Sequence, residues 1–243
     1  LKLVEARGDE ITFTFGRFNP PTIGHEKLID ATKKAATREY RVYASKSQDP
    51  KKNPLDYEQK VQWMKRMFPK HKGKIVGGGN YKTALDVAVK LYDEGFLNLT
   101  MVVGSDRVKE FKNLLDRYNG VKSRHGLYDF KTINVKSAGE RDPDAEGVAG
   151  MSASKMRKAA MDNDFKAFAQ GLPPKFKDGD RLFNDIKKKM PIKEFKEWDV
   201  DLEEASIMTV LGKKLFNKEY VAAVSMYKKF VKQGEKSGQA IHR

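Results

Sequence analysis

Ten residues near the start of the chain, GRFNPPTIGH at 16–25, combine features that suit the binding of a phosphate. Gly16 allows a tight exit from the preceding run or a positive φ, and the two prolines fix φ and stiffen the turn. Thr22 is a good N-cap for a helix, Gly24 leaves room at the first helical turn, and His25 adds an imidazole. Backbone N–H groups and the dipole of a helix start attract anions. Two interpretations follow from these residues: an anion site, or a stiff turn in which His25 is only a polar cap.

The elements that must position this turn alternate along the chain. Apolar, β-prone runs predict strands at 11–15, 40–45, 74–78, 99–105 and 131–135. Helical spacing predicts helices at 25–36, 56–68, 83–95, 106–118 and 154–160. We therefore predict an α/β fold, a Rossmann-like parallel sheet with helices on both faces. Ligands bind beyond the carboxyl ends of such strands, which is where this turn lies.

The alternation lasts to about residue 170 and then stops. The stretch 171–180, GLPPKFKDGD, has the composition of a linker, and beyond it only helical patterns follow, at 180–190 and 218–233. We predict a Rossmann-like domain over 1–170 and a small helical extension of unknown role over 171–243. The polar, aperiodic stretch 136–150 predicts a mobile loop.

The chain is basic, with 48 Lys and Arg against 33 Asp and Glu and a formal net charge of +15. This charge predicts anionic partners such as nucleotides, phosphate esters, nucleic acid or an acidic protein surface, although a lysine-rich solvated surface explains the same number. The absence of cysteine excludes a disulfide scaffold, a thiol nucleophile and a cysteine zinc site. No apolar run approaches the roughly 18 residues of a membrane helix, and we expect a cytoplasmic protein without a membrane partner.

The first turn resembles the G-x-F-x-P-x-[HT]-x-G-H signature of the cytidylyltransferase-like nucleotidyltransferases. That superfamily includes nicotinamide mononucleotide adenylyltransferases, phosphopantetheine adenylyltransferase and glycerol-phosphate cytidylyltransferase. The matching residues are Gly16, Phe18, Pro20, Thr22, Gly24 and His25. The opening Gly-Arg-Phe, which contains Arg17, is most similar to the archaeal-type nicotinamide mononucleotide adenylyltransferases.

A second stretch, MSASKMRKAA at 151–160, resembles the I-S-x-T-x-x-R motif of the same family. Ser152, Ser154 and Arg157 fit the motif, with Ser154 at the position where threonine is usual. Taken alone, this pattern is more often a capped helix. Its place behind a polar loop, far along the chain from the first motif, makes it informative.

Two further stretches support the resemblance by their order. In the segment 45–64, Lys46 and Lys52 are candidates for the family's lysine before a helix, and Lys51 competes with them. The alternative is a basic surface loop.

The other stretch is VVGSDR at 102–107, in which Gly104 and Asp106 match the family's G-x-D. An acidic residue at this position is often just a helix cap. The resemblance covers roughly residues 10–170, and the extension matches no family.

The resemblance implies nucleotidyl transfer, in which a phosphate of a second substrate attacks the α-phosphorus of a nucleoside triphosphate and pyrophosphate leaves. It implies that His25 and Thr22 contact the triphosphate, that Ser154 and Arg157 hold its β- and γ-phosphates, and that Lys46 or Lys52 positions the attacking phosphate. Mg²⁺ would bridge phosphate oxygens without a protein carboxylate cage. The residues expected to bind the nucleotide are Gly16, Arg17, Phe18, Gly24, His25, Gly104, Asp106, Ser152, Ser154 and Arg157.

The resemblance to archaeal-type enzymes favours ATP and nicotinamide mononucleotide as substrates, and a cytidylyltransferase that uses CTP is the alternative. Class I aminoacyl-tRNA synthetases share this type of fold, but 243 residues without a recognisable tRNA-binding appendage argue against them. An alternative of another class is a non-catalytic assembly or nucleic-acid-binding protein on the same scaffold. The lysine-rich composition and the tail are similar to those of phage-encoded members, which would make a virion partner or location an alternative. Apolar positions in the tail would suit packing on the domain or a homo-oligomer.

Overall fold

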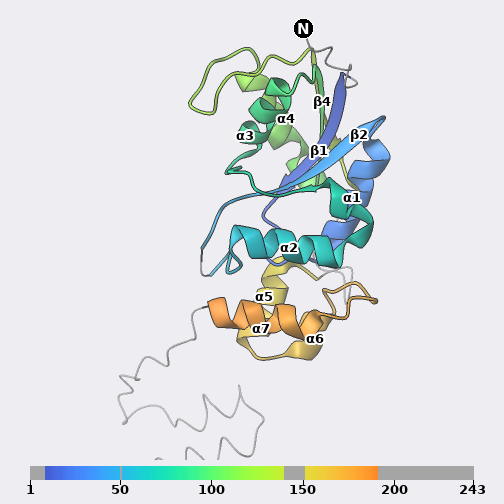
Figure 1. The fold of residues 1–243 in the computed structure, drawn as a ribbon, viewed down its shortest axis with the longest axis vertical. Coiled ribbons are helices and arrows are strands. Elements are labelled where there is room, and N and C mark those ends of the chain that lie inside the picture. The colour runs from blue at the N-terminus through green and yellow to red at the C-terminus, as the bar shows by residue number, and fades with distance from the viewer. Residues whose placement is uncertain (1–8, 50, 140–150, 191–243) are drawn as a thin grey trace, which may run out of the picture. The chain divides into compact units, whose positions relative to one another are not determined.

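The structure is a computed structural model that describes residues 9–49, 51–139 and 151–190. Five strands form one sheet in which every neighbouring pair is parallel. They are β1 (Glu10–Gly16), β2 (Glu39–Ala44), β3 (Ile75–Val76), β4 (Asn98–Val103) and β5 (Thr132–Ser137). The order is β3-β2-β1-β4-β5 (Figure 1), so the chain moves outward from β1 to β3 and then crosses back to the other side of β1. This is the Rossmann-like parallel sheet that the alternation predicts.

The described residues contain seven α-helices. They are α1 (Ile23–Ala35), α2 (Tyr57–Met67), α3 (Ala84–Asp93), α4 (Val108–Tyr118), α5 (Ala153–Met161), α6 (Phe165–Ala169) and α7 (Gly179–Lys189), with 3₁₀ turns η1 (Pro69–Lys74) and η2 (Ser105–Arg107). The five helices predicted before residue 170 are confirmed to within a few residues, whereas α6 and the 3₁₀ turns were not predicted. Within the described ranges, every helix is too short or too polar to cross a membrane.

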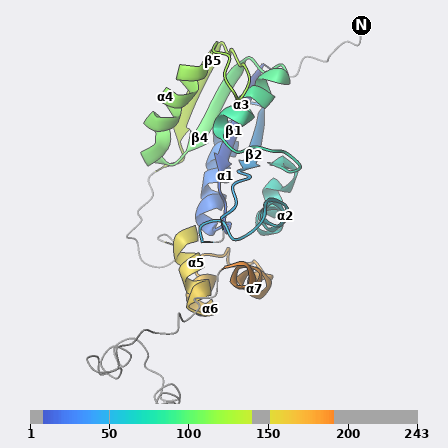
Figure 2. The ribbon, with the colours of Figure 1, turned by 90° about the vertical axis from the view of Figure 1, so that its left-hand side faces the viewer.

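Two apolar clusters lie on opposite faces of the sheet and hold the helices to it. Side chains alternate along β1, so Ile11 and Phe13 belong to the cluster that packs beneath α3 and α4. The other cluster joins β2 to α1, α2, α5 and α7, and includes Val42 and Ile29. In Figure 1, α3 and α4 lie to the left of β1 and α1 lies to its right, and Figure 2 gives the view turned by 90°. The predicted coverage of both faces is therefore confirmed.

Helix α7 lies past the predicted boundary at residue 170, yet it shares the core of the preceding residues. Its buried side chains belong to the cluster that contains α2 and α5. The indole Nε1 of Trp63 on α2 donates to Asp185 Oδ2 at 3.0 Å, and Lys189 Nζ lies 2.8 Å from Asp56 Oδ2. The described residues accordingly belong to one compact unit. The loop predicted at 136–150 starts later than expected, because Lys136 and Ser137 still belong to β5. Its residues 140–150 and the helix predicted at 218–233 lie outside the described residues.

Replacement of the α7 core residue Ile186 tests whether this helix unfolds with the sheet. Ile186 has no exposed surface, so Ile186→Ala is expected to lower the free energy of unfolding by about 2–5 kcal/mol. The exposed Asn184 lies on the same helix, and Asn184→Ala should change it by no more than about 0.5 kcal/mol. Urea denaturation followed by circular dichroism measures both. A separate early transition in Ile186→Ala, with the main transition unmoved, would contradict a shared core.

Candidate active site

The turn between β1 and α1 is supported by contacts among its own residues. Phe18 is buried and has a left-handed backbone with φ 47°. Its ring lies so close to Gly16 that a Cβ there would be 3.1 Å from Phe18 Cε2. The same ring meets the His25 imidazole edge-on, with ring centroids 4.9 Å apart. Gly16 and Phe18, both predicted to bind nucleotide, thus shape the turn and place the imidazole.

Thr22 and His25 form a reciprocal cap at the start of α1. The His25 backbone N–H donates to Thr22 Oγ1 at 3.3 Å, and the Thr22 backbone N–H donates to His25 Nδ1 at 2.9 Å. Because Nδ1 accepts from a backbone donor, the neutral ring carries its proton on Nε2. The cap and the anion site are therefore compatible. Nδ1 takes part in the cap, and Nε2 carries the proton that could be donated to a phosphate oxygen. Gly24 is exposed at this helix start, with only Thr22 Oγ1 near its missing Cβ.

The start of α5 meets the first turn through Arg157. Its Nη1 donates to the Asn19 carbonyl oxygen at 2.6 Å, across 138 residues of sequence, and its Nη2 donates to Ser154 Oγ at 2.9 Å. Ser152 is the N-cap of α5 and accepts from the Lys155 backbone N–H at 3.0 Å. The structure thus brings the two predicted phosphate motifs together, with Ser154 bound to Arg157.

Positive charge gathers where the two motifs meet. Burial lowers the pKa of Arg157, and the nearby Arg17 guanidinium lowers it further. Asp49, on the loop after β2, opposes that shift. An anion bound between the two guanidinium groups would relieve their repulsion and stabilise their charged forms. Arg17 is exposed, so it is accessible to such a ligand.

The two predicted lysines lie on the loop between β2 and α2, and both are exposed. The backbone of this loop is anchored: the Lys46 N–H donates to the Tyr81 carbonyl at 2.7 Å, and the Lys52 N–H donates to Asp49 Oδ1 at 2.7 Å. Within the described residues, no hydrogen bond joins either ammonium group to His25 or Arg157. Their role towards the attacking phosphate stays a prediction.

The end of β4 lies level with the end of β1. The parallel register pairs Phe13 with Met101, so Gly16 and Gly104 leave the sheet side by side, at the point where the strand order reverses. Open α/β sheets bind ligands at this switch point. A Cβ on Gly104 would lie 2.7 Å from Asp106 Oδ1, so the glycine makes room for that carboxylate.

Asp106 does not cap the following helix. The sequence predicted a helix from residue 106 and allowed Asp106 to be its cap. In the structure, α4 begins at Val108, its N-cap is Arg107, and no side chain caps it. Asp106 instead lies in the 3₁₀ turn η2. The helix-cap alternative is therefore wrong.

Several buried polar residues in this region were not assigned from the sequence, and two of them join parts of the site. One is Asn19, whose side-chain amide binds both backbone groups of Leu55. The other is Lys60 on α2, which has no exposed surface. Its Nζ donates to the Ser45 carbonyl at 2.5 Å, and the Ser45 N–H donates to the Gly16 carbonyl at 2.8 Å. A signal was available, because helical spacing places position 60 beside Val61 and Met64 on the apolar face.

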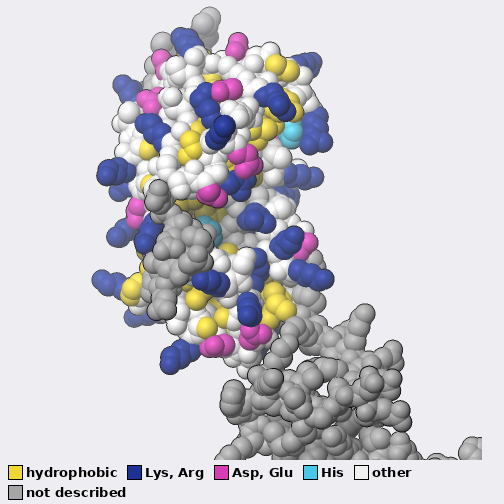
Figure 3. Space-filling view, turned by 180° about the vertical axis from the view of Figure 1, so that it is seen from behind, with side chains coloured by type: hydrophobic (Ala, Val, Ile, Leu, Met, Phe, Trp, Pro, Cys, Tyr) yellow, Lys and Arg dark blue, Asp and Glu magenta, His cyan; other side chains and the backbone are white. Residues whose placement is uncertain are grey.

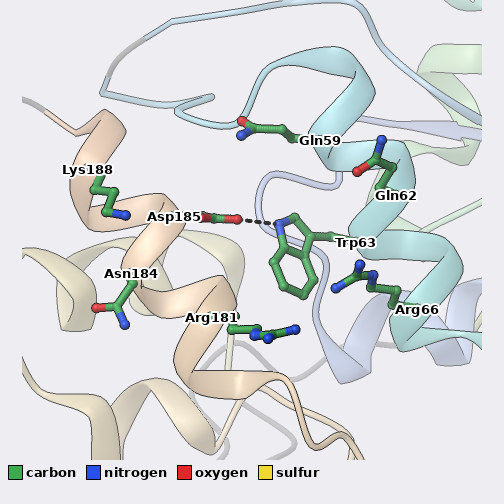
Figure 4. A pocket seen from close by; sticks show the side chains of 8 residues that line it. All are labelled: Gln59, Gln62, Trp63, Arg66, Arg181, Asn184, Asp185 and Lys188. Carbon is green, nitrogen blue, oxygen red and sulfur yellow. Dashed lines mark hydrogen bonds between the residues drawn. The ribbon is translucent and has the colours of Figure 1, made fainter.

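A groove of about 430 Å³ lies elsewhere, between α2 and α7 (Figure 4). It is lined by Gln59, Gln62, Trp63, Arg66, Arg181, Asn184, Asp185 and Lys188. None of these residues belongs to the predicted site, and the indole N–H of Trp63 is bound to Asp185 across the groove. The groove is thus a feature of how α7 packs on α2, separate from the carboxyl edge of the sheet.

The family model described as cytidylyltransferase-like matches residues 13–159. This range covers more than half of the 243 residues, begins within β1 and ends within α5, and so includes both motifs. The chain therefore belongs to the cytidylyltransferase-like family, and this membership supports nucleotide binding and a nucleotidyltransferase activity. None of the curated proteins matches the chain.

The buried amine of Lys60 predicts a pH-dependent stability. Burial lowers its pKa from 10.5 to about 8, so between these values the unfolded chain binds the extra proton and stability rises with pH. Relative to Lys60→Met, the wild type should therefore gain unfolding free energy as the pH rises from 8 towards 10. Urea denaturation of both proteins at several pH values measures the difference between their unfolding free energies. Other titrating groups contribute equally to both proteins and cancel in this difference. A difference that stays flat over this range would contradict a buried, destabilised charge.

Proposed function

We propose that the protein transfers a nucleoside monophosphate from a nucleoside triphosphate to a phosphate-bearing small molecule and releases pyrophosphate. The observation that carries this proposal is the hydrogen bond from Arg157 to the Asn19 carbonyl, which joins the two phosphate motifs at one edge of the sheet. Family membership supports the class of reaction, since the matched range spans both motifs.

The residues present suit a reaction that needs charge stabilisation more than a protein nucleophile. The attacking phosphate is already ionised, so orientation and electrostatic stabilisation supply the catalysis. His25 would donate from Nε2 to the α-phosphate or to the leaving oxygens, since its Nδ1 accepts from Thr22. Arg157, backed by Arg17, would bind the β- and γ-phosphates with its planar fork. Lys46 or Lys52 would meet the incoming acceptor phosphate.

Magnesium would enter with the triphosphate. Among the described residues, no group of three or more His, Cys, Asp or Glu could hold a metal ion. In the proposed reaction, Mg²⁺ would be held by phosphate oxygens and water, as it prefers. When bound, the ion would neutralise charge on the pyrophosphate that leaves.

We favour ATP and nicotinamide mononucleotide as the substrates, on the similarity of the Gly-Arg-Phe opening to archaeal-type enzymes. CTP and a phosphorylated alcohol form the alternative pair. Backbone groups near Gly104 would read the base, because that glycine leaves the sheet beside Gly16 at the switch point.

The distribution of charge bears on a non-catalytic, nucleic-acid-binding role. Figure 3 shows Lys and Arg side chains dispersed over one face of the molecule, with acidic side chains between them. A nucleic-acid footprint would more often be a single basic stripe. The presence of His25, Ser154 and Arg157, which match the two phosphate motifs of the family, also favours catalysis.

A thermal-shift screen with ATP, CTP, GTP and UTP, each with Mg²⁺, tests nucleotide binding. A bound triphosphate stabilises the native state by about 2.7 kcal/mol at a hundredfold excess over Kd, so at least one should raise Tm. The shift should be lost in Arg157→Met and kept in Lys166→Met, which removes the same charge from an exposed site on α6. If none of the four triphosphates raises Tm, the proposal is wrong.

Variants of His25 separate catalysis from capping. His25→Ala should lower kcat by about 10²–10³, the usual effect of losing one preorganised donor, but it also removes half of the cap. His25→Gln provides the control, because glutamine at this position can accept from the Thr22 N–H and complete a capping box. We expect His25→Gln to keep the wild-type Tm and still lose kcat. Pyrophosphate release measures turnover, and near-normal turnover in either variant would exclude a catalytic His25.

A further inference from the structure

We propose that Asn19 is a positioning residue that fixes the acceptor side of the active site against its triphosphate side. This inference rests on the proposed function. In this proposal, the side chain of Asn19 holds the acceptor loop, and its backbone carbonyl holds Arg157 on the triphosphate side.

The side chain of Asn19 holds the loop between β2 and α2. Its Nδ2 donates to the Leu55 carbonyl at 2.8 Å, and the Leu55 N–H donates to its Oδ1 at 3.1 Å. Asn19 and Leu55 are both buried. The amide therefore holds the loop by two hydrogen bonds to Leu55, and we call this pair of bonds the clamp. A neighbouring strand would bond to the backbone in the same way.

The backbone carbonyl of Asn19 serves the other half of the site. It accepts from Arg157 Nη1 at 2.6 Å. A replacement of the Asn19 side chain removes the clamp on Leu55 and leaves this carbonyl in place. The two functions can therefore be separated by a single substitution.

Leu55 is a suitable point from which to control the loop. The next residue, Asp56, is the N-cap of α2 and accepts from the Gln59 backbone N–H at 2.9 Å. On the other side of Leu55, the loop carries Lys46 and Lys52, the candidates for binding the acceptor phosphate. The clamp restrains the backbone of the loop that carries the two lysines. Because the loop is already ordered, less conformational entropy is lost when the acceptor binds.

The chain contains a matched control for this clamp. Asn119, at the C-terminal end of α4, makes the same two bonds to one residue: its Nδ2 donates to the Phe130 carbonyl at 3.0 Å, and the Phe130 N–H donates to its Oδ1 at 2.8 Å. Phe130 precedes β5, at the edge of the sheet opposite the site. Asn119→Ala removes the same chemistry and should affect stability without touching the acceptor loop.

The expected effect of Asn19→Ala is selective. The KM for the acceptor should rise, and kcat should fall, by about tenfold to a hundredfold in kcat/KM, as expected when a reacting group is misplaced. The Kd for the triphosphate should stay near the wild-type value, because Arg157 keeps its carbonyl partner. Asn19→Asp keeps the size of the side chain but replaces the donor that faces the Leu55 carbonyl, so it should behave similarly.

The test uses the full chain and two independent measurements. Hydrogen–deuterium exchange follows residues 46–56, which should exchange faster in Asn19→Ala and Asn19→Asp but not in Asn119→Ala. Steady-state kinetics use ATP with nicotinamide mononucleotide or CTP with glycerol 3-phosphate, whichever pair releases pyrophosphate, and calorimetry with the same triphosphate gives its Kd.

The outcomes separate the two proposals. If the wild type turns over neither pair, the proposed function loses its support, and exchange of residues 46–56 still decides the positioning role. If exchange of that segment is unchanged in both Asn19 variants, the inference is overturned. It is also overturned if the acceptor KM of Asn19→Ala matches that of Asn119→Ala, or if triphosphate binding weakens as much as acceptor binding.

Discussion

The hydrogen bond between the Arg157 guanidinium and the Asn19 carbonyl is the contact on which the site depends. It ties the start of α5 to the turn after β1, two segments that the sheet does not bring together by itself. A charged donor on a backbone carbonyl is stronger than a neutral pair, and burial of the guanidinium strengthens it further. A second bond, from the Ile23 N–H to the Gly171 carbonyl at 2.8 Å, also joins the start of α1 to the segment that follows α6.

The same edge of the sheet holds positive charges whose neighbours only partly balance them. Arg157 has a lowered pKa because it is half-buried and lies near Arg17, and Lys60 is buried on a carbonyl oxygen with its pKa lowered to about 8. Buried charges usually have ionic partners. A polyanionic substrate could neutralise the excess positive charge at this carboxyl edge of the sheet. The electrostatics therefore agree with the proposed reaction.

In the proposed mechanism, capping and catalysis use the same residues. The reciprocal bonds between Thr22 and His25 start α1, and they also set the tautomer that makes the imidazole a donor on its outer nitrogen. The edge-on contact with Phe18 fixes the ring from the other side. Local folding rules therefore orient the group that the proposed chemistry needs, and a short stretch of sequence was enough to predict it.

The sequence by itself determined the alternation of strands and helices, the cap at Thr22, and the residue types of both phosphate motifs, because these depend on local periodicity and spacing. Only the tertiary structure decided that Arg157 binds the Asn19 carbonyl, that Asn19 clamps Leu55, and that α7 completes a core with α2. These contacts join residues far apart in the chain, and their partners are mostly backbone groups, which carry no residue-specific signal. Lys60 lies between the two cases: its place on an apolar helix face was visible in the sequence, but its burial on the Ser45 carbonyl required the fold.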